Sequence, residues 1–156
     1  MSAPVAARPT TVDPRAPRFG AAITAVLLLV DVFLGVAGST LASVLLLAAV
    51  TALFAWGAFA GIRRHPYGLL FRRFVRPRLA PPGDLEDAAA PTFAQLIGFV
   101  VTVAGLAVAL AGVPLAAPIA AGVAFLAAFL NAVFDFCLGC ELYLLLVRAG
   151  VLGRRR

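Results

Sequence analysis

Long apolar stretches separated by short polar breaks occupy most of the chain. A hydrocarbon core about 30 Å thick is crossed by roughly 20 helical residues. Four almost uncharged stretches reach that length: Phe19–Gly38, Leu41–Ile62, Phe93–Gly112 and Leu115–Phe134, the last continuing as an apolar run to Val147. The pattern therefore predicts four transmembrane helices.

The breaks inside each pair of stretches are very short. Gly38-Ser39-Thr40 and Gly112-Val113-Pro114 leave room only for tight turns between neighbouring helices. We therefore expect an all-α, polytopic membrane protein built from two helical hairpins. It divides into a flexible tail (1–15), a first hairpin (16–62), an Arg-rich interfacial loop (63–91), a second hairpin (92–149) and a basic tail (150–156).

The composition supports a membrane protein. Of the 156 residues, 63% are apolar and only 13% are charged, whereas a soluble domain is about 45–50% apolar and about 25% charged. Such a chain has too little polar surface to cover a globule in water. Two cysteines are also too few to form the framework of a secreted disulfide-rich domain.

Arginine placement predicts the orientation. All thirteen basic residues are Arg; three precede the first span, six lie in the central loop and four follow the last span. The positive-inside rule then places both termini and the central loop in the cytoplasm. The net charge of +6 is thus mainly a topology signal, and no nucleic-acid partner is expected. A cleaved signal peptide over residues 1–38 would leave three spans and move the C-terminal arginines to the other side, so it is the weaker interpretation.

The two hairpins resemble each other at a shift of 74 residues. Ala16-Pro17-Arg18-Phe19 aligns with Ala90-Pro91-Thr92-Phe93, and Ala37-Gly38 aligns with Ala111-Gly112. The pattern indicates a parallel internal repeat about an axis normal to the membrane; the alternative is two similar hairpins shaped by the same membrane. In a repeat, Arg63, Arg64 and His65 would be the counterparts of residues 137–142.

The cysteines are candidates for redox chemistry. Cys137 and Cys140 form a C-x-x-C motif near the expected cytoplasmic end of the fourth helix. Residues at i and i+3 share a helix face, so the two sulfurs can meet, and Glu141 joins that face as a possible proton acceptor. Such a pair suits a reversible dithiol. Catalytic roles are therefore predicted for Cys137, Cys140 and Glu141.

Other interpretations of the cysteines stay open. Arg63, Arg64 or His65 could stabilise a thiolate if the halves pack as a repeat. The cysteines could instead act as small apolar side chains between helices. A zinc site with His65 and Glu141 is a further alternative, but no second C-x-x-C or His pair completes a ligand set. No cofactor is expected.

Three polar residues lie inside the apolar stretches. Asp31 falls in the first span, and Asn131 and Asp135 fall in the fourth, four residues apart on a face roughly opposite the cysteines. Polar groups in a bilayer usually face the bundle or water. They could line a proton path or a small-solute site, or they could make hydrogen bonds between helices.

Two motifs resemble a bacterial membrane family known as domain of unknown function 4395. They are Val12-Asp13-Pro14-Arg15, followed by Arg18-Phe19, and the run from Phe134 through Cys137 and Cys140 to Tyr143. The resemblance covers about residues 12–149. It implies a multi-pass protein often encoded beside thioredoxin-like and rhodanese-type sulfurtransferase genes, which favours thiol or sulfur chemistry but assigns no reaction.

Our first hypothesis is an inner-membrane thiol–disulfide or sulfur-relay protein that works with a cytoplasmic thioredoxin-like or rhodanese-type partner; the corresponding enzyme class is a thiol–disulfide oxidoreductase. A second is a non-enzymatic scaffold that docks a soluble partner through residues 63–91. A third is a carrier of a small sulfur anion that uses the arginines and Asn131. The sequence predicts contact with the lipid bilayer and leaves the oligomeric state open.

Overall fold

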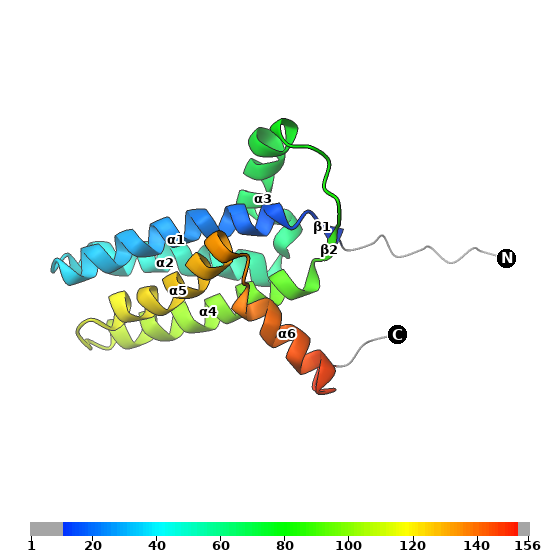
Figure 1. The fold of residues 1–156 in the computed structure, drawn as a ribbon. Coiled ribbons are helices and arrows are strands. Elements are labelled where there is room, and N and C mark those ends of the chain that lie inside the picture. The colour runs from blue at the N-terminus through cyan, green and yellow to red at the C-terminus, as the bar shows by residue number, and fades with distance from the viewer. Residues whose placement is uncertain (1–10, 153–156) are drawn as a thin grey trace.

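Four long helices form an elongated bundle in the computed structural model, which describes residues 11–152 (Figure 1). They are α1 (Arg15–Val36), α2 (Thr40–Phe59), α4 (Ala89–Leu110) and α5 (Ala116–Phe134). Helix α1 packs against α2 and α5, and α4 packs against the same two helices. All four are long and apolar enough to cross a membrane. The expected all-α, four-span architecture is confirmed, with helix ends displaced by at most four residues.

Glycines end the first helix of each hairpin. Gly38 has φ +85° and Gly112 has φ +89°, values that glycine adopts without the steric penalty of a Cβ atom. The chain reverses at these positions, and the next helix begins within a few residues. We call this end of the bundle, at residues 37–39 and 111–115, the turn end. The opposite end, with segment 60–88, is the arginine end.

The internal repeat is visible in the structure. Under a shift of 74 residues, the bounds of α1 coincide with those of α4. Helix α1 packs on α5, and α2 packs on α4. In each hairpin, the first helix therefore packs against the second helix of the other hairpin. Buried positions recur at the same shift, in the pairs Leu28/Thr102, Ser43/Ala117, Leu47/Ala121 and Val50/Ala124. The two hairpins therefore correspond in helix bounds, in packing partners and in these buried positions.

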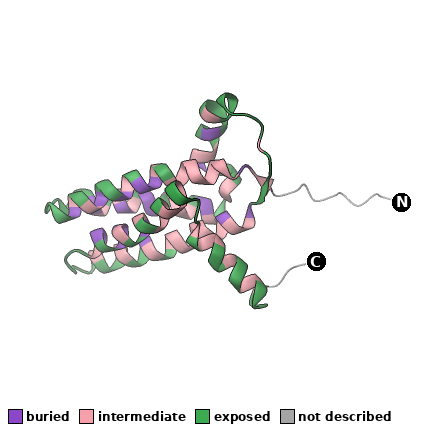
Figure 2. Cartoon of the chain, viewed as in Figure 1, coloured by how far each residue is buried: buried purple, intermediate pink, exposed green. Residues whose placement is uncertain are grey.

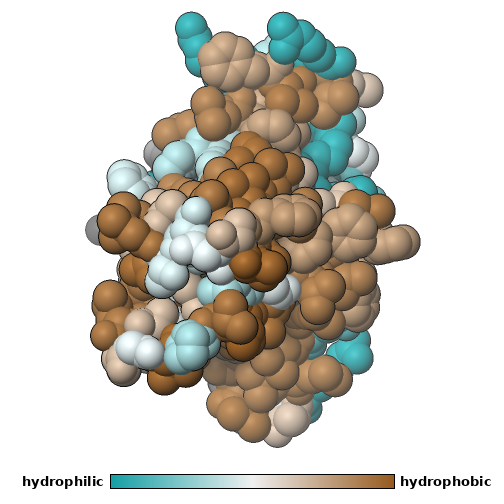
Figure 3. Space-filling view, turned by 90° about the vertical axis from the view of Figure 1, so that its left-hand side faces the viewer, coloured by the Kyte–Doolittle hydropathy of each residue, from teal (hydrophilic) through white to brown (hydrophobic). Residues whose placement is uncertain are grey.

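The packed core lies toward the turn end. Its buried members are Leu28, Leu47, Val50, Ala117, Ala120, Ala121 and Ala124, on the inner faces of the helices (Figure 2). Large apolar side chains such as Phe33, Phe59 and Leu126 are exposed on the outer faces, as expected for helices in lipid. Viewed onto the turn end, the surface is mostly apolar, with strongly hydrophilic side chains at its edges (Figure 3).

An arm projects sideways at the arginine end (Figure 1). It consists of short helical turns: η1 (Ile62–Arg64), α3 (Pro66–Leu70), the π-helical turn η2 (Phe71–Val75) and η3 (Arg76–Arg78). Strand β2 (Glu86–Asp87) then pairs antiparallel with β1 (Thr11–Val12). Residues 11–15, which the sequence assigned to a flexible tail, thus form β1 and the start of α1. The remainder of that tail and the last four residues lie outside the described part.

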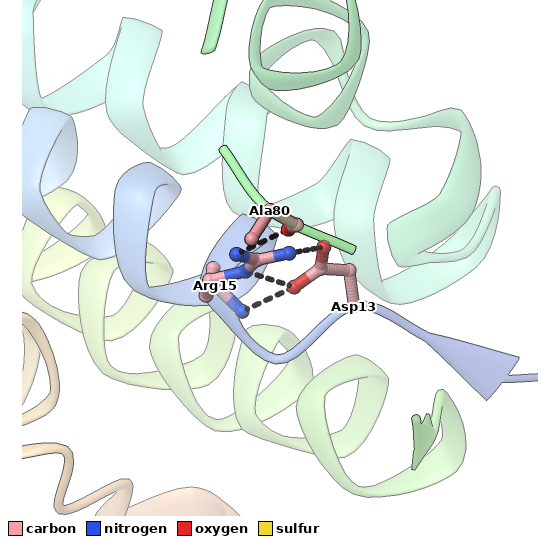
Figure 4. Close-up of polar contacts among 3 residues, drawn as sticks. All are labelled: Asp13, Arg15 and Ala80. Atoms are coloured by element: carbon pink, nitrogen blue, oxygen red, sulfur yellow. Dashed lines mark hydrogen bonds and ion pairs between the residues drawn. The ribbon is translucent and has the colours of Figure 1, made fainter. Parts of the chain in front are cut away.

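A hydrogen bond from Arg15, which also pairs with Asp13, joins the chain just after the arm to the start of α1 (Figure 4). The Arg15 guanidinium donates to both carboxylate oxygens of Asp13, at 2.9 and 2.8 Å, and to the Ala80 carbonyl at 3.1 Å. The hydrogen bond from Arg15 keeps the pKa of the buried Asp13 carboxyl below its ordinary value. The Asp-Pro-Arg motif therefore holds the chain where it returns from the arm toward the bundle.

The fourth membrane helix does not continue to Val147. Helix α5 ends at Phe134, Asp135 adopts a left-handed conformation with φ 59°, and a separate helix, α6 (Leu138–Arg148), follows. Aspartate tolerates that conformation better than most residues. Helix α6 leaves the bundle at an angle (Figure 1). The expectation that the C-x-x-C motif lies on the fourth membrane helix is therefore wrong.

Candidate functional site

The two cysteines lie at the bend between α5 and α6. Their sulfurs are within disulfide-bonding distance and their Cα atoms are 5.2 Å apart, a usual separation for a disulfide. The prediction that the sulfurs meet is confirmed, but not through a shared helix face. Cys137 is the extended residue just before α6, and Cys140 lies in the first turn of that helix.

Local structure favours negative charge on Cys137. Its Sγ accepts a hydrogen bond of 3.3 Å from the backbone N–H of Cys140, as an N-cap side chain does. The N-terminus of an eleven-residue helix carries partial positive charge. Both effects stabilise a thiolate. Glu141 is exposed one residue beyond Cys140, and its N–H donates to the Cys137 carbonyl.

Close packing on α4 places the start of α6. A Cβ atom added to Gly139 would lie 2.6 Å from the Cα atom of Ala94, so only glycine permits this approach. One helical turn further on, the rings of Tyr143 and Phe93 lie 5.6 Å apart between centroids. These contacts hold the cysteine pair against the arginine end of the bundle.

An open cavity of about 530 Å³ contains the cysteine pair. Arg18, Asn131, Asp135 and Glu141 line it together with both cysteines. Arg18 Nε lies 3.3 Å from Asp135 Oδ1, and the same guanidinium donates to the Ala132 carbonyl at 3.4 Å. Arg18 is thus the cation that the fold brings to this cavity. The sequence analysis counted it only as a topology signal, although it stands in the Arg18-Phe19 motif at the start of α1.

Two further expectations about this region need correction. Asn131 and Asp135 line the same cavity as the cysteines rather than an opposite face, because the chain bends at Asp135. Asp135 also follows α5 instead of lying within the span, and its side chain is 63% exposed. It is therefore a hydrated partner of Arg18.

The second group of predicted residues lies elsewhere. His65 is buried; its Nε2 lies 3.1 Å from the Leu53 carbonyl and its Nδ1 accepts from the Tyr67 N–H. Burial lowers the pKa of His65. Arg63 and Arg64 line a different cavity, of about 970 Å³. Arg63, Arg64 and His65 do not line the cavity that contains the cysteines.

Metal ligands are not gathered anywhere in residues 11–152. No three of the His, Cys, Asp and Glu side chains in that range lie close enough together to hold an ion. His65, required for the zinc alternative, is engaged with Leu53 and Tyr67 instead.

Asp31 is buried in the turn half of the bundle, apart from the cysteine cavity. Its Oδ1 accepts a 2.6 Å hydrogen bond from the Ser43 hydroxyl. Its Oδ2 is buried without a hydrogen-bond partner among the described residues. Asp31 lines neither cavity that Cys137 lines.

A second, smaller cavity of about 120 Å³ lies between the helices and also reaches Cys137. It is formed mainly by α1, α4, α5 and the start of α6. Pro17, Pro91, Asn131 and Cys137 line both cavities. The cysteine pair therefore lies where these two cavities meet.

The family model for "Domain of unknown function (DUF4395)" matches residues 12–148. The chain belongs to this family. The DUF4395 region begins in β1 and contains the whole of α6, so it includes the Asp-Pro-Arg motif and both cysteines. No curated protein and no solved structure is significantly similar to the chain.

Proposed function

We propose that this chain is a thiol–disulfide exchange protein of the bacterial inner membrane. Its Cys137–Cys140 pair faces the cytoplasm and exchanges two electrons with a soluble thioredoxin-like or rhodanese-type partner. The observation that carries the proposal is the pair of sulfurs at bonding distance on the wall of an open cavity, beside Arg18 and Glu141. The distribution of the thirteen arginines supports the orientation.

The geometry assigns different roles to the two sulfurs. Of these two cavities, Cys140 lines only the larger one, whereas Cys137 lines both. A thiolate of the partner attacks Cys140 Sγ, the disulfide breaks, and Cys137 leaves as the thiolate. Cys137 is the better leaving group because the Cys140 N–H and the α6 N-terminus favour its charge.

The second step completes the exchange. A second thiolate of the partner attacks its own sulfur in the mixed disulfide and releases Cys140, which takes up a proton. Glu141, exposed in the same cavity, carries that proton. The partner's dithiol has become a disulfide, and the Cys137–Cys140 disulfide has gained two electrons. Disulfides in a reducing compartment are usually transient and catalytic, which agrees with such a cycle.

Alkylation mass shifts on isolated membranes test the proposal. Oxidant should protect both cysteines from a maleimide reagent, and reductant should expose both, over repeated cycles. A Cys137→Ser variant should trap a mixed disulfide with the partner at Cys140, and Cys140→Ser should trap less because Cys140 is the sulfur that the partner attacks. Cysteines that never form a reversible disulfide would exclude this function. Full function of a Cys137→Ser, Cys140→Ser double variant would point to a docking scaffold.

A further inference from the structure

A wide, open cavity at the arginine end gathers three arginines. It has a volume of about 970 Å³ and lies between the end of α2, the start of α4 and helix α6. Arg63, Arg64 and Arg72 line it, and none of its lining residues is acidic. Among residues 11–152, the only ion pairs are the two described above, at Arg15 and at Arg18. The three lining arginines therefore have no carboxylate partner in that range. We call this cavity the arginine groove.

Hydrogen bonds hold this part of the arm against the bundle. Arg72 Nη1 donates to the Arg63 carbonyl at 3.2 Å, which brings together two residues that are nine positions apart. The Ile62 N–H donates to the Thr92 hydroxyl at 3.5 Å, which joins η1 to the first turn of α4. Thr92 also lines the groove, and its hydroxyl group can donate to an oxygen of a ligand. The arginines are therefore attached to α4 as well as to the end of α2.

Other residues that line the arginine groove are apolar. Among them are Phe93 and Leu96 of α4. Leu96 and Phe99 are three residues apart and share a helix face. The Phe99 ring packs against that of Phe59, with centroids 5.5 Å apart, and Phe59 is 72% exposed. The apolar lining therefore continues onto the outer surface of two helices that are long and apolar enough to cross a membrane.

This combination fits an amphiphile with a phosphate group. A guanidinium group forms paired hydrogen bonds with phosphate oxygens. The groove lies where α2 ends and α4 begins, which is the level of the phosphate groups in a bilayer, and basic pockets between transmembrane helices bind anionic head groups. Ligand cavities are usually about 300–1,000 Å³, so the groove is large enough for a head group. A soluble anion would use the arginines and leave the apolar lining uncovered.

We propose that the arginine groove binds one anionic phospholipid from the leaflet at the arginine end. The three arginines hold its phosphate, and its acyl chains follow the apolar lining toward the Phe59–Phe99 ring pair. This binding is non-covalent and independent of the proposed thiol–disulfide function. Tyr143 lines both the arginine groove and the cavity that contains the cysteines, so the bound lipid lies against the helix that carries Cys140.

Native mass spectrometry of the full-length protein in detergent tests the site. The probes are phosphatidylglycerol and phosphatidylcholine with the same acyl chains. The wild type should bind the first phosphatidylglycerol about tenfold more tightly than the first phosphatidylcholine, because only the former has a net negative charge. The groove variant carries Arg63→Gln, Arg64→Gln and Arg72→Gln. The matched control carries Arg73→Gln, Arg76→Gln and Arg78→Gln. It loses the same charge from the same arm outside the groove, so it should keep the preference that the groove variant loses.

The soluble head group glycerophosphoglycerol, which has no acyl chains, distinguishes a lipid from a free anion. At the lipid concentration that saturates the groove, it should leave bound phosphatidylglycerol in place; displacement would overturn the lipid assignment. Equal affinity of the wild type for the two lipids would exclude the site. An equal loss of preference in the groove variant and the control would also exclude it, because the charge of the whole arm would then be responsible. Far-UV circular dichroism checks that both variants fold, and the two experiments on the wild type need no variant.

Discussion

Arg18 in the first turn of α1 forms an ion pair with Asp135, the left-handed residue that ends α5, with Nε and Oδ1 3.3 Å apart. The pair joins the beginning of the first hairpin to the bend that carries the cysteines. Because both side chains are partly exposed, its direct contribution to stability is small. Its greater effect is to hold a cation in the cysteine cavity.

Replacing Arg18 with Gln should therefore lower the reactivity of Cys137. In a Cys140→Ser background at neutral pH, we expect the rate of maleimide alkylation to fall about threefold to tenfold, since the thiolate loses a nearby positive charge. Arg18→Lys should restore most of the rate. Asp135→Asn, which keeps the cation and removes its partner, should alkylate at least as fast as the parent. An unchanged rate in Arg18→Gln would show that the guanidinium does not act on the sulfur.

Gly139 should tolerate no larger side chain. The Cβ of Gly139→Ala would meet the backbone of Ala94 at 2.6 Å, so α6 must shift away from α4. We expect a loss of about 1–3 kcal/mol in stability and slower re-formation of the disulfide after reduction. Gly122→Ala is the control, because its Cβ would lie 3.9 Å from the nearest Val32 side-chain atom. Thermal unfolding in detergent should show no loss of stability in this control variant. Equal effects of the two variants would contradict the packing argument.

The buried contact between Ser43 and Asp31 should show strong coupling. Ser43→Ala leaves the carboxyl group without its hydrogen-bond donor and should cost about 1–3 kcal/mol. Adding Asp31→Val to that variant removes both polar partners and should recover most of the loss. The free energies of unfolding of the wild type, the two single variants and the double variant, measured in mixed micelles, give the coupling between the two side chains. Simple additivity of the two substitutions would mean that the hydrogen bond contributes little.

Burial of His65 predicts a dependence of stability on pH. Its pKa lies below the ordinary value of 6.5 in the folded protein because of burial, with the Leu53 carbonyl acting in the opposite direction. The unfolded chain therefore binds the proton first, and stability should fall as the pH drops below about 6.5. A His65→Gln variant lacks this term. Between pH 8 and pH 5, the melting temperature of the wild type should therefore fall more than that of the variant. An equal fall in both proteins would contradict a lowered pKa for His65 in the folded state.

Sequence patterns predicted the spans because a bilayer imposes one requirement, about 20 apolar residues per helix. The positions of Gly38 and Gly112 predicted the hairpins for an equally local reason. The bend at Asp135 was missed because apolar residues continue on both sides of it. The left-handed backbone conformation of one residue does not change the hydropathy pattern from which the spans were predicted. That bend decides the site: it brings Asn131 and Arg18 to the cysteines and makes Cys137 a helix cap. The two cavities at Cys137 depend on how several helices pack together, and no single stretch of sequence specifies that packing.

The repeat has a consequence for how the two hairpins recognise each other. Leu47 and Val50 of the first hairpin occupy positions that in the second are Ala121 and Ala124, all of them buried. Bulky side chains on one copy thus fill the space left by small ones on the other. Side-chain volume at these positions therefore favours pairing of each hairpin with the other one of the same chain over pairing with a second copy of itself.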